Sequence, residues 1–491
     1  MRSFCLVFTL STFLSLRAHA QAPGIDRVLP PAALQEDFAY LRKIVETTHP
    51  GLYMHHGREV MQFKMDSLSH QLNVPLSIYE FYKKIAYLVA EIRCEHTYCG
   101  YGNTFDSLAR TWKLIPFQFY FSQGRAYVAV NRTRDKAIQL GDELVAVNGQ
   151  PIDSIRNELY KYIPSDGYML PSKDQQLSSM AFNLWYYEFI GRPDTFAITT
   201  RNKKSELITK KYWQQLTISE SNTNAVKNPV NKHIIAVSEK NQKRNSHPWR
   251  LEFLEEKNAA LLTIQTFTGE KEKFFSTIDS LFSLLERKGT TSLILDVSSN
   301  GGGDEELAAE LLSYFIEKPT RYISEEYLIT DADDHLKLSN APEDVLKDKY
   351  AFIEPLKDGK SIVKLSKYSQ ELKMVVPKPN RFKGKVYLYV NGITSSAAST
   401  FAAIMQSNRL AEVFGEETAG SFAGGGTVIG LDLTLPNSKI TAHTSIVYQV
   451  FATQCSDKDR GVIPDHPFVP SFTDLVNGNE GWRRFVMEAV K

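Results

Sequence analysis

The spacing of hydrophobic positions changes along the chain, and each change predicts a different kind of structure. From residue 31 to about residue 97, apolar side chains recur every three or four positions, which is typical of amphipathic helices. Between residues 100 and 204, short runs rich in aromatic and β-branched residues predict strands, with a hairpin turn at residues 122–125. After residue 250, buried strands alternate with helices. This order predicts an α/β protein whose main domain is preceded by a helical region and a β-rich module.

The same pattern sets the expected boundaries. We assign residues 21–99 to the helical domain, residues 100–204 to the β-rich module and residues 251–491 to the α/β core. The tract between them, residues 205–250, is polar and has few apolar positions in register. We therefore interpret this tract as a linker or excursion.

Residues 1–20 have a different character. A short basic start and an apolar run are followed by Ala18-His19-Ala20, the order of a secretory signal peptide cut after Ala20. The apolar run is too short for a membrane anchor, and no later segment is long and apolar enough to span a bilayer. We expect an exported protein, periplasmic or extracellular after cleavage.

Composition narrows the function classes. The 491 residues carry a net charge of +1, with 43% hydrophobic and 23% charged residues, so the basic footprint of a nucleic-acid binder is absent. The glycine-rich loop after residue 297 lacks the Gly-Lys-Ser/Thr of a phosphate loop and the Gly-x-Gly-x-x-Gly of a dinucleotide site. We expect a soluble globular protein that needs no cofactor.

Signal removal leaves Cys94, Cys99 and Cys455, an odd number in an oxidising compartment. One disulfide and one free thiol is the simplest account. Cys94 and Cys99 resemble half of a metal site, but no second Cys/His pair has zinc spacing. We therefore expect no metal.

A strand, a tight turn and a helix near residue 390 carry the candidate chemistry. The apolar residues 386–390 break at Asn391-Gly392 and lead into Thr394-Ser395-Ser396-Ala397 before a helix. Backbone N–H groups and the positive helix end at such a place can stabilise an alkoxide or an oxyanion. From this stretch alone, two interpretations stay open: a nucleophilic serine, or a serine that caps the helix.

Two other features bear on that choice. Residues 293–297 form a second buried strand that runs into the glycine-rich residues 298–304 and a helix, so two such turns side by side can supply two halves of an oxyanion hole. His96 follows the end of an N-terminal helix, between Glu95 and two nearby cysteines. It is either a functional histidine or a histidine on a surface loop.

Taken together and in order, six motifs resemble the tail-specific (C-terminal-processing) serine peptidases. They are His96 after the helical region, the module from Gly141-Asp142 to Gly149, residues 296–303, residues 394–399, Gly415-Glu416-x-Thr418-x-Gly420, and Gly461-Val462-Ile463-Pro464-Asp465.

The resemblance implies a crotonase-like (ClpP-like) α/β core preceded by an N-terminal helical region and a PDZ-like module. It also implies hydrolysis of peptide bonds in a peptide or unfolded protein. The nucleophile falls on Ser396, and the backbone N–H groups of Ala397 and Gly302 fall in the oxyanion hole, each donor being worth about 3 kcal/mol.

The sequence departs from the bacterial branch of that family at the general base. That branch uses a lysine twenty-five residues after the nucleophile, and here this position is Ser421. A neutral hydroxyl cannot act as that base, so a Ser-Lys dyad is excluded.

The tricorn-core arrangement fits better, because there a histidine before the PDZ-like module activates the serine. His96 stands at that position and needs no extreme pKa shift to act near neutral pH. Glu95 precedes it, and Asp457 and Asp459 precede the last motif. We expect one carboxylate, Glu95 or Asp459 above all, to orient His96, while Asp465 shapes a turn.

The resemblance leaves three points open. If His96 and residues 457–461 converge on one site, Cys455 lies near Cys94 or Cys99, and a disulfide could clamp the base. The resemblance also extends to interphotoreceptor retinoid-binding proteins, so the alternative function is a catalytically retired protein that carries a peptide or a small apolar ligand. The sequence does not indicate the oligomeric state.

Overall fold

The fold was analysed in a computed structural model, which describes residues 24–102, 112, 114–213, 218–244, 247–329, 335, 337–341, 346, 352–355, 362–365, 372–454, 457–478 and 480–490. The expected signal peptide, residues 1–20, lies outside the described residues. Within them, no helix is long and apolar enough to cross a membrane.

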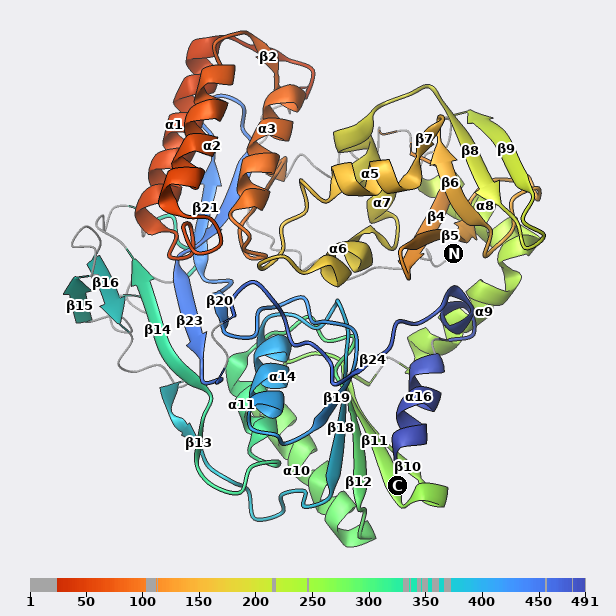
Figure 1. The fold of residues 1–491 in the computed structure, drawn as a ribbon, viewed down its shortest axis with the longest axis vertical. Coiled ribbons are helices and arrows are strands. Elements are labelled where there is room, and N and C mark those ends of the chain that lie inside the picture. Colours follow the sequence, from red (N-terminus) through yellow and green to blue (C-terminus); the bar gives the residue numbers. More distant parts are fainter. Residues whose placement is uncertain are drawn as a thin grey trace.

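Three helices form the N-terminal region, and their apolar faces pack together (Figure 1). Ser77 and Glu80 form a capping box at the start of the third helix. The two short strands of this region pair with each other. The elements are β1 (Val28–Leu29), α1 (Pro31–Thr48), α2 (Arg58–Gln71), β2 (Leu76–Ser77) and α3 (Ile78–Glu91).

A separate sheet forms the middle module, with strand order β4-β5-β6-β8-β9 and β7 beside β6. Its strands alternate between buried and more exposed residues, as in a sheet with one face on a core. The elements are β4 (Phe117–Ser122), β5 (Arg125–Asn131), β6 (Glu143–Val147), β7 (Gln150–Pro151), α5 (Ile152–Leu159), α6 (Leu170–Leu177), α7 (Ala181–Trp185), a π-helical turn (Tyr186–Ile190), β8 (Thr195–Arg201) and β9 (Leu207–Trp213).

The expected linker, residues 205–250, is folded, so its interpretation as a linker is wrong. It contains β9, the helices α8 (Ile218–Lys227) and α9 (Lys232–Arg244), and the start of β10. Its polar residues are structural: Asn231 is fully buried and exchanges hydrogen bonds with the backbone of Asn131. Buried asparagines that pair with backbone leave no hydrophobic pattern, so hydrophobic spacing does not predict that such a segment is folded.

The main domain is the expected α/β structure, built on a six-stranded sheet of order β10-β11-β12-β18-β19-β24. Only the first pair, β10 and β11, is antiparallel. One face packs against α10, α11 and α14, and the other against α16 (Figure 1). The elements are β10 (Trp249–Leu254), β11 (Ala259–Ile264), α10 (Lys271–Lys288), β12 (Ser292–Asp296), α11 (Glu305–Leu312), β18 (Lys385–Val390), α14 (Ala397–Ser407), β19 (Glu412–Gly415), β24 (His466–Pro467), α15 (Phe472–Val476) and α16 (Gly481–Ala489).

Smaller sheets join the main domain to the N-terminal region. The strand that follows the helical region, β3 (Tyr98–Gly100), pairs with β22 of the C-terminal part. The other elements are β13 (Thr320–Arg321), β14 (Ile323–Ile329), β15 (Phe352–Pro355), β16 (Ile362–Leu365), β17 (Met374–Val375), β20 (Gly424–Gly426), β21 (Gly430–Thr434), β22 (Thr441–Ser445) and β23 (Val447–Phe451).

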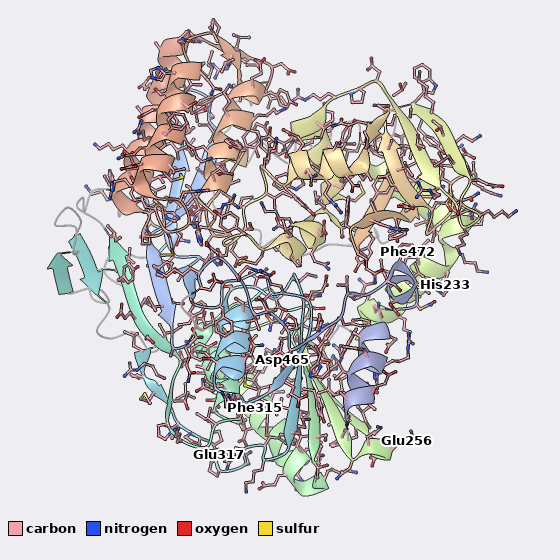
Figure 2. The ribbon with its side chains drawn as sticks, in the orientation of Figure 1. His233, Glu256, Phe315, Glu317, Asp465 and Phe472 are labelled. Atoms are coloured by element: carbon pink, nitrogen blue, oxygen red, sulfur yellow. The ribbon has the colours of Figure 1, made fainter. Side chains whose placement is uncertain are left out.

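The C-terminal segment also contacts the middle module. The ring centroid of Phe472, which is labelled in Figure 2, lies 5.4 Å from the ring centroid of Tyr127. It also covers Gly141, where a Cβ would come within 2.9 Å of the Phe472 ring. Asp465, also labelled, accepts a hydrogen bond from the Val413 N–H at 2.8 Å. Its carboxylate therefore fixes the start of β19, in line with the turn-shaping role expected for it.

Candidate active site

Ser396 occupies a sharp turn between β18 and α14. It precedes the helix directly, with φ +52° and ψ −131°, and its side chain makes no capping hydrogen bond. The helix-cap alternative is therefore wrong for this serine. A positive φ is rare for a residue with a side chain and costs roughly 1–3 kcal/mol, so the surrounding structure must hold it in place.

The turn before Ser396 is held by Thr394, which is fully buried. The Thr394 hydroxyl donates to the Val297 carbonyl at 3.1 Å and accepts from the Asn391 N–H at 3.1 Å. Its carbonyl accepts from the Ala419 N–H at 2.8 Å. Residues 391–396, here called the nucleophile turn after the role expected of Ser396, are thus tied to the strand end before the glycine-rich loop and to the Gly415–Gly420 motif.

Gly302 packs directly against Ser396. A Cβ at Gly302 would lie 2.6 Å from the Ser396 Cβ and 3.0 Å from the Ala397 nitrogen, and the φ of Gly302 is +99°. Only glycine allows this approach. The glycine-rich loop and the nucleophile turn therefore lie side by side, as the two strand-turn-helix patterns predict.

The two predicted oxyanion donors differ in whether their N–H groups already have an acceptor in the structure. The Ala397 N–H is the first of α14 and has no acceptor within the helix, so it can face a substrate oxygen. The Gly302 N–H, expected to be the second donor, instead donates to Asn300 Oδ1 at 2.9 Å. An asparagine side chain that bonds its own backbone two residues on is a common turn device, and it corrects the expectation for Gly302 in this conformation.

Residues 94–97, here called the base segment after the role expected of His96, lie against the nucleophile turn. The Ser395 hydroxyl donates to Glu95 Oε1 at 2.5 Å, a contact between residues 300 positions apart. The same oxygen lies 3.5 Å from His96 Nε2. The Glu95 carboxylate thus bridges the nucleophile turn and the His96 imidazole. Its contact in the turn is Ser395, whereas the sequence analysis chose Ser396 as the nucleophile.

Burial controls the protonation of His96. Loss of hydration lowers the pKa of His96 below its ordinary 6.5, the Glu95 carboxylate acts to raise it, and the nearby His443 acts to lower it. The imidazole is therefore largely neutral at pH 7, the form that can accept a proton.

Asp459 lies elsewhere than expected. Its carboxylate accepts a hydrogen bond from His55 Nδ1 at 2.7 Å, and its side chain is 52% exposed. Among the contacts of the described residues, Glu95 rather than Asp459 is the carboxylate next to His96. The Asp459 backbone instead contacts the loop before α6, because its carbonyl accepts the Tyr168 N–H at 3.0 Å.

The expected disulfide is not formed, because Cys94 and Cys99 are both free thiols. Cys94 is buried beside β20, where a Cβ at Gly426 would come within 2.7 Å of its sulfur. Cys99 lies in β3, paired in register with Ala442. Cys455 lies outside the described residues.

One residue of this site was not predicted from the sequence. The Glu95 N–H donates to Asp166 Oδ1 at 2.9 Å, and Asp166 belongs to the middle module. No motif surrounds it, so the sequence carries no signal for this contact.

Comparison with known proteins supports a peptidase. Residues 258–468 match peptidase family S41. This segment is less than half of the chain. The matched segment contains both glycine-rich turns and Ser396, and it identifies the chain as a serine peptidase. A search of curated proteins found no significant match.

Solved structures share the fold over most of the chain. Mature CPAF superposes with a TM-score of 0.59 at 15% identity, covering 94% of this chain and 97% of that one. A mutant of CPAF gives 0.61 at 15% identity, with 94% and 97% covered. CPAF complexed with lactacystin gives 0.58 at 14% identity, with 94% and 98% covered. At this identity the likeness shows the fold alone, and it extends well beyond the S41 domain.

Proposed function

We propose that the chain is an exported serine endopeptidase, similar to C-terminal-processing peptidases, in which Ser396 attacks the peptide carbonyl and His96 is the general base. The observation that carries the proposal is the placement of Ser396 at a strained turn against Gly302 and Ala397, with the Glu95–His96 pair reaching the same turn through Ser395. This arrangement supports the proposal that the chain is closer to the tricorn-core branch than to the Ser-Lys branch.

The reaction uses neutral His96. As Ser396 Oγ bonds to the substrate carbonyl carbon, its proton passes to the imidazole and the carbonyl π electrons move to oxygen. The Ala397 N–H stabilises that oxyanion; a second donor becomes available if Gly302 exchanges its Asn300 bond for the substrate oxygen. Collapse of the intermediate expels the amine, which takes the proton from His96, and water then hydrolyses the acyl-enzyme by the same route. The Glu95 carboxylate stabilises the transient imidazolium.

The test is labelling with a serine-directed phosphonate, followed by peptide mapping. We expect one adduct on Ser396, complete loss of labelling and of peptide cleavage in Ser396→Ala, and a loss of at least about 1,000-fold in His96→Ala. Ser395→Ala should label about tenfold more slowly, because it loses only the contact to Glu95. An adduct on Ser395 would reverse the assignment of the two serines, and a folded protein that never labels would favour the retired binding protein.

For the middle module we propose a PDZ-like role in docking an extended peptide. Its support is the sheet order, in which β9 pairs only with β8 among the described strands and so leaves one edge available for strand addition. An unstructured peptide added to Ser396→Ala should slow amide hydrogen exchange in β9. Unchanged exchange there would reject this role.

Export rests on the pattern of residues 1–20. Amino-terminal sequencing of the protein recovered from the periplasm or medium should begin at Gln21. A protein retained in the cytoplasm with Met1 intact would reject export.

A further inference from the structure

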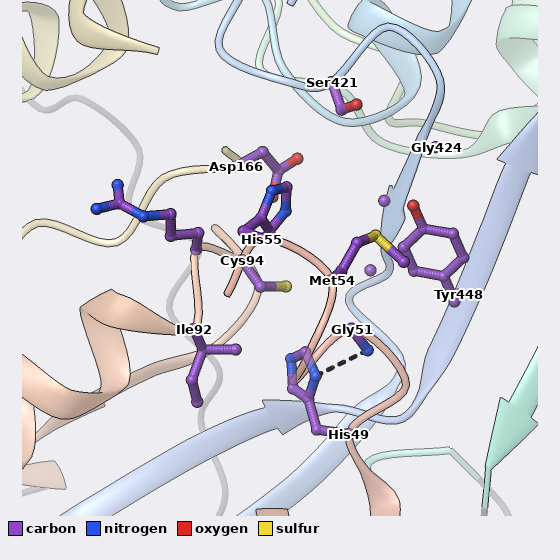
Figure 3. A pocket seen from close by; sticks show the side chains of 13 residues that line it. His49, Gly51, Met54, His55, Ile92, Cys94, Asp166, Ser421, Gly424 and Tyr448 are labelled. Atoms are coloured by element: carbon purple, nitrogen blue, oxygen red, sulfur yellow. Dashed lines mark hydrogen bonds between the residues drawn. The ribbon is translucent and has the colours of Figure 1, made fainter. Parts of the chain in front are cut away.

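Asp166 is a buried acid in the loop between α5 and α6, outside the S41 domain. It is 7% exposed. Its Oδ1 accepts the Glu95 N–H at 2.9 Å. Figure 3 shows Asp166 at the wall of a small pocket, together with Cys94, His55 and Ser421. It therefore stands where the base segment, the middle module and the C-terminal part meet.

The other contacts of Asp166 lead to the nucleophile turn. Ser421 lines the same pocket as Asp166, and its backbone N–H acts to lower the pKa of the Asp166 carboxyl. Ser421 follows Gly420, where a Cβ would lie 3.3 Å from the Ser396 nitrogen. The position that the Ser-Lys branch reserves for its base thus lies in the same pocket wall as Asp166. The Asp166 carboxyl binds the Glu95 N–H on one side, and on the other it faces the segment that follows Gly420.

The loop that carries Asp166 is held independently of its side chain. The Gly167 N–H donates to the Arg93 carbonyl at 3.2 Å, and the Tyr168 N–H donates to the Asp459 carbonyl at 3.0 Å. Gly167 has φ +48°, and a Cβ there would lie within 2.6 Å of the Asp459 carbonyl oxygen. Because the backbone fixes the loop, a change of the Asp166 side chain acts mainly on its partners.

The surroundings of Asp166 favour its neutral form. Burial raises the pKa of Asp166 well above its ordinary value, the Glu95 carboxylate raises it further, and the two backbone N–H groups act in the opposite direction. The other titratable groups that line the same pocket are His49, His55, Arg93, Cys94 and Tyr448. An asparagine at position 166 would therefore reproduce both the shape and the charge of the native group.

We propose that Asp166 is a positioning residue for the peptidase reaction, one that sets the Glu95 carboxylate and the His96 imidazole against the nucleophile turn. This inference rests on the function proposed above. The Glu95 N–H and carboxylate belong to one residue, so a partner that fixes the first also aims the second. Without Asp166, the Glu95 N–H loses its partner at a partly buried position, and the base segment must move to pair it with water.

The experiment compares Asp166→Ala, Asp166→Asn and a matched control, Asp37→Ala. Asp37 is fully buried in α1, and its carboxylate oxygens accept the Asn437 N–H at 2.7 Å and the Ser438 N–H at 2.8 Å. It makes the same kind of contact as Asp166, in a part of the fold that carries no proposed catalytic group. The control therefore separates loss of stability from loss of positioning.

Two measurements are made on each full-length variant. The phosphonate labelling rate should fall about 10-fold to 100-fold in Asp166→Ala, and by less than about threefold in Asp166→Asn and Asp37→Ala. The pKa of His96, followed by NMR of its ring, should rise toward 6.5 in Asp166→Ala, because a loosened segment admits water. It should not change in Asp37→Ala.

Each result decides the proposal. If Asp166→Ala labels like Asp37→Ala and leaves the His96 pKa unchanged, Asp166 has only a structural role. If Asp166→Ala does not fold, Asp166→Ser, which retracts the oxygen, should still raise the His96 pKa, and an unchanged value rejects the proposal. If the wild-type chain never labels, the peptidase proposal fails, and the His96 pKa in Asp166→Ala alone decides whether Asp166 positions that residue.

Discussion

The nucleophile turn is built from a short stretch of chain and from backbone, whereas the base segment is held by side chains from distant parts of the sequence. Ser396 takes its position from β18, α14 and the glycine that faces it. Glu95, in contrast, is held by Ser395 from the core and by Asp166 from the middle module. The nucleophile turn is therefore held by its own local backbone, and the base segment is held only when three regions of the chain pack together.

This difference separates two tasks. The groups that bind the developing oxyanion must not move, and close-packed glycines and helix ends provide that rigidity. The base must accept and release a proton, and a histidine held by replaceable contacts suits that task. Changes on the nucleophile side should therefore abolish activity, whereas changes on the base side should reduce it in steps and shift its pH dependence.

The largest effect is expected for Gly302→Ala. Its new Cβ would lie 2.6 Å from the Ser396 Cβ and 2.9 Å from the Ser395 carbonyl oxygen, at a φ of +99°, so the loop or the turn must move. We expect the labelling rate to fall by at least about 1,000-fold, since the serine and the oxyanion donors are displaced together.

Gly301→Ala is the matched control for that substitution. A Cβ built at Gly301 meets no atom within 4 Å, so this variant should label within about threefold of wild type. Equal rates for the two variants would show that the approach of Gly302 to Ser396 does not matter for the reaction.

The two halves also differ in how far the sequence predicts them. The strands, glycine turns and helix around Ser396 are local patterns, so the α/β core and a serine at the start of this helix follow from hydrophobic spacing and turn residues alone. The choice of Ser396 over Ser395 follows only from the resemblance to serine peptidases. The internal bond from Gly302 to Asn300 does not follow, because any asparagine two residues before a glycine allows it without requiring it.

The base side is predicted only through the resemblance to serine peptidases, which selects His96 among eleven histidines. Its partners cannot be found by spacing, since Asp166 is 71 positions from Glu95 and Ser395 is 300 positions away. The folding of residues 218–244 was missed for a related reason: buried asparagines such as Asn231 pair with distant backbone, and that pairing leaves no periodic pattern.

Among base-side changes that keep His96, Glu95→Gln should have the strongest effect. It keeps the shape but removes the charge that bridges Ser395 and His96. We expect the labelling rate at pH 7 to fall about 100-fold, as a triad loses its oriented imidazolium.

The pH dependence provides an internal check on that variant. The Glu95 charge raises the pKa of His96, so in Glu95→Gln the acid limb of the labelling profile should move to lower pH. Asp166→Ala should move it to higher pH, as argued above. A shift in the same direction for both variants would contradict the separate roles given to the two acids.

For the wild-type chain, the acid limb itself is a smaller but direct test. Labelling requires neutral His96, and burial lowers the pKa of that residue below 6.5. As pH falls from 8, the rate should stay constant until it passes through this lowered pKa, with more than half of the maximal rate kept at pH 6.5. A midpoint above pH 6.5 would mean that His96 is solvated or that another group is the base.

The smallest effect is expected for Asp459→Asn, although the sequence singled out Asp459 as an orienting carboxylate. In the structure this carboxylate pairs with His55 at 2.7 Å and is 52% exposed. Burial lowers the pKa of His55, so this contact is a hydrogen bond to a largely neutral imidazole, and such a bond contributes about 0.5–1.5 kcal/mol. The backbone carbonyl that holds the loop before α6 is unchanged by the substitution. The labelling rate should stay within about twofold of wild type, with the acid limb unmoved. A 100-fold loss would instead make Asp459 a second acid that orients His96, beside Glu95. Asp459 would then have to lie closer to His96 in the working enzyme than it does in this structure.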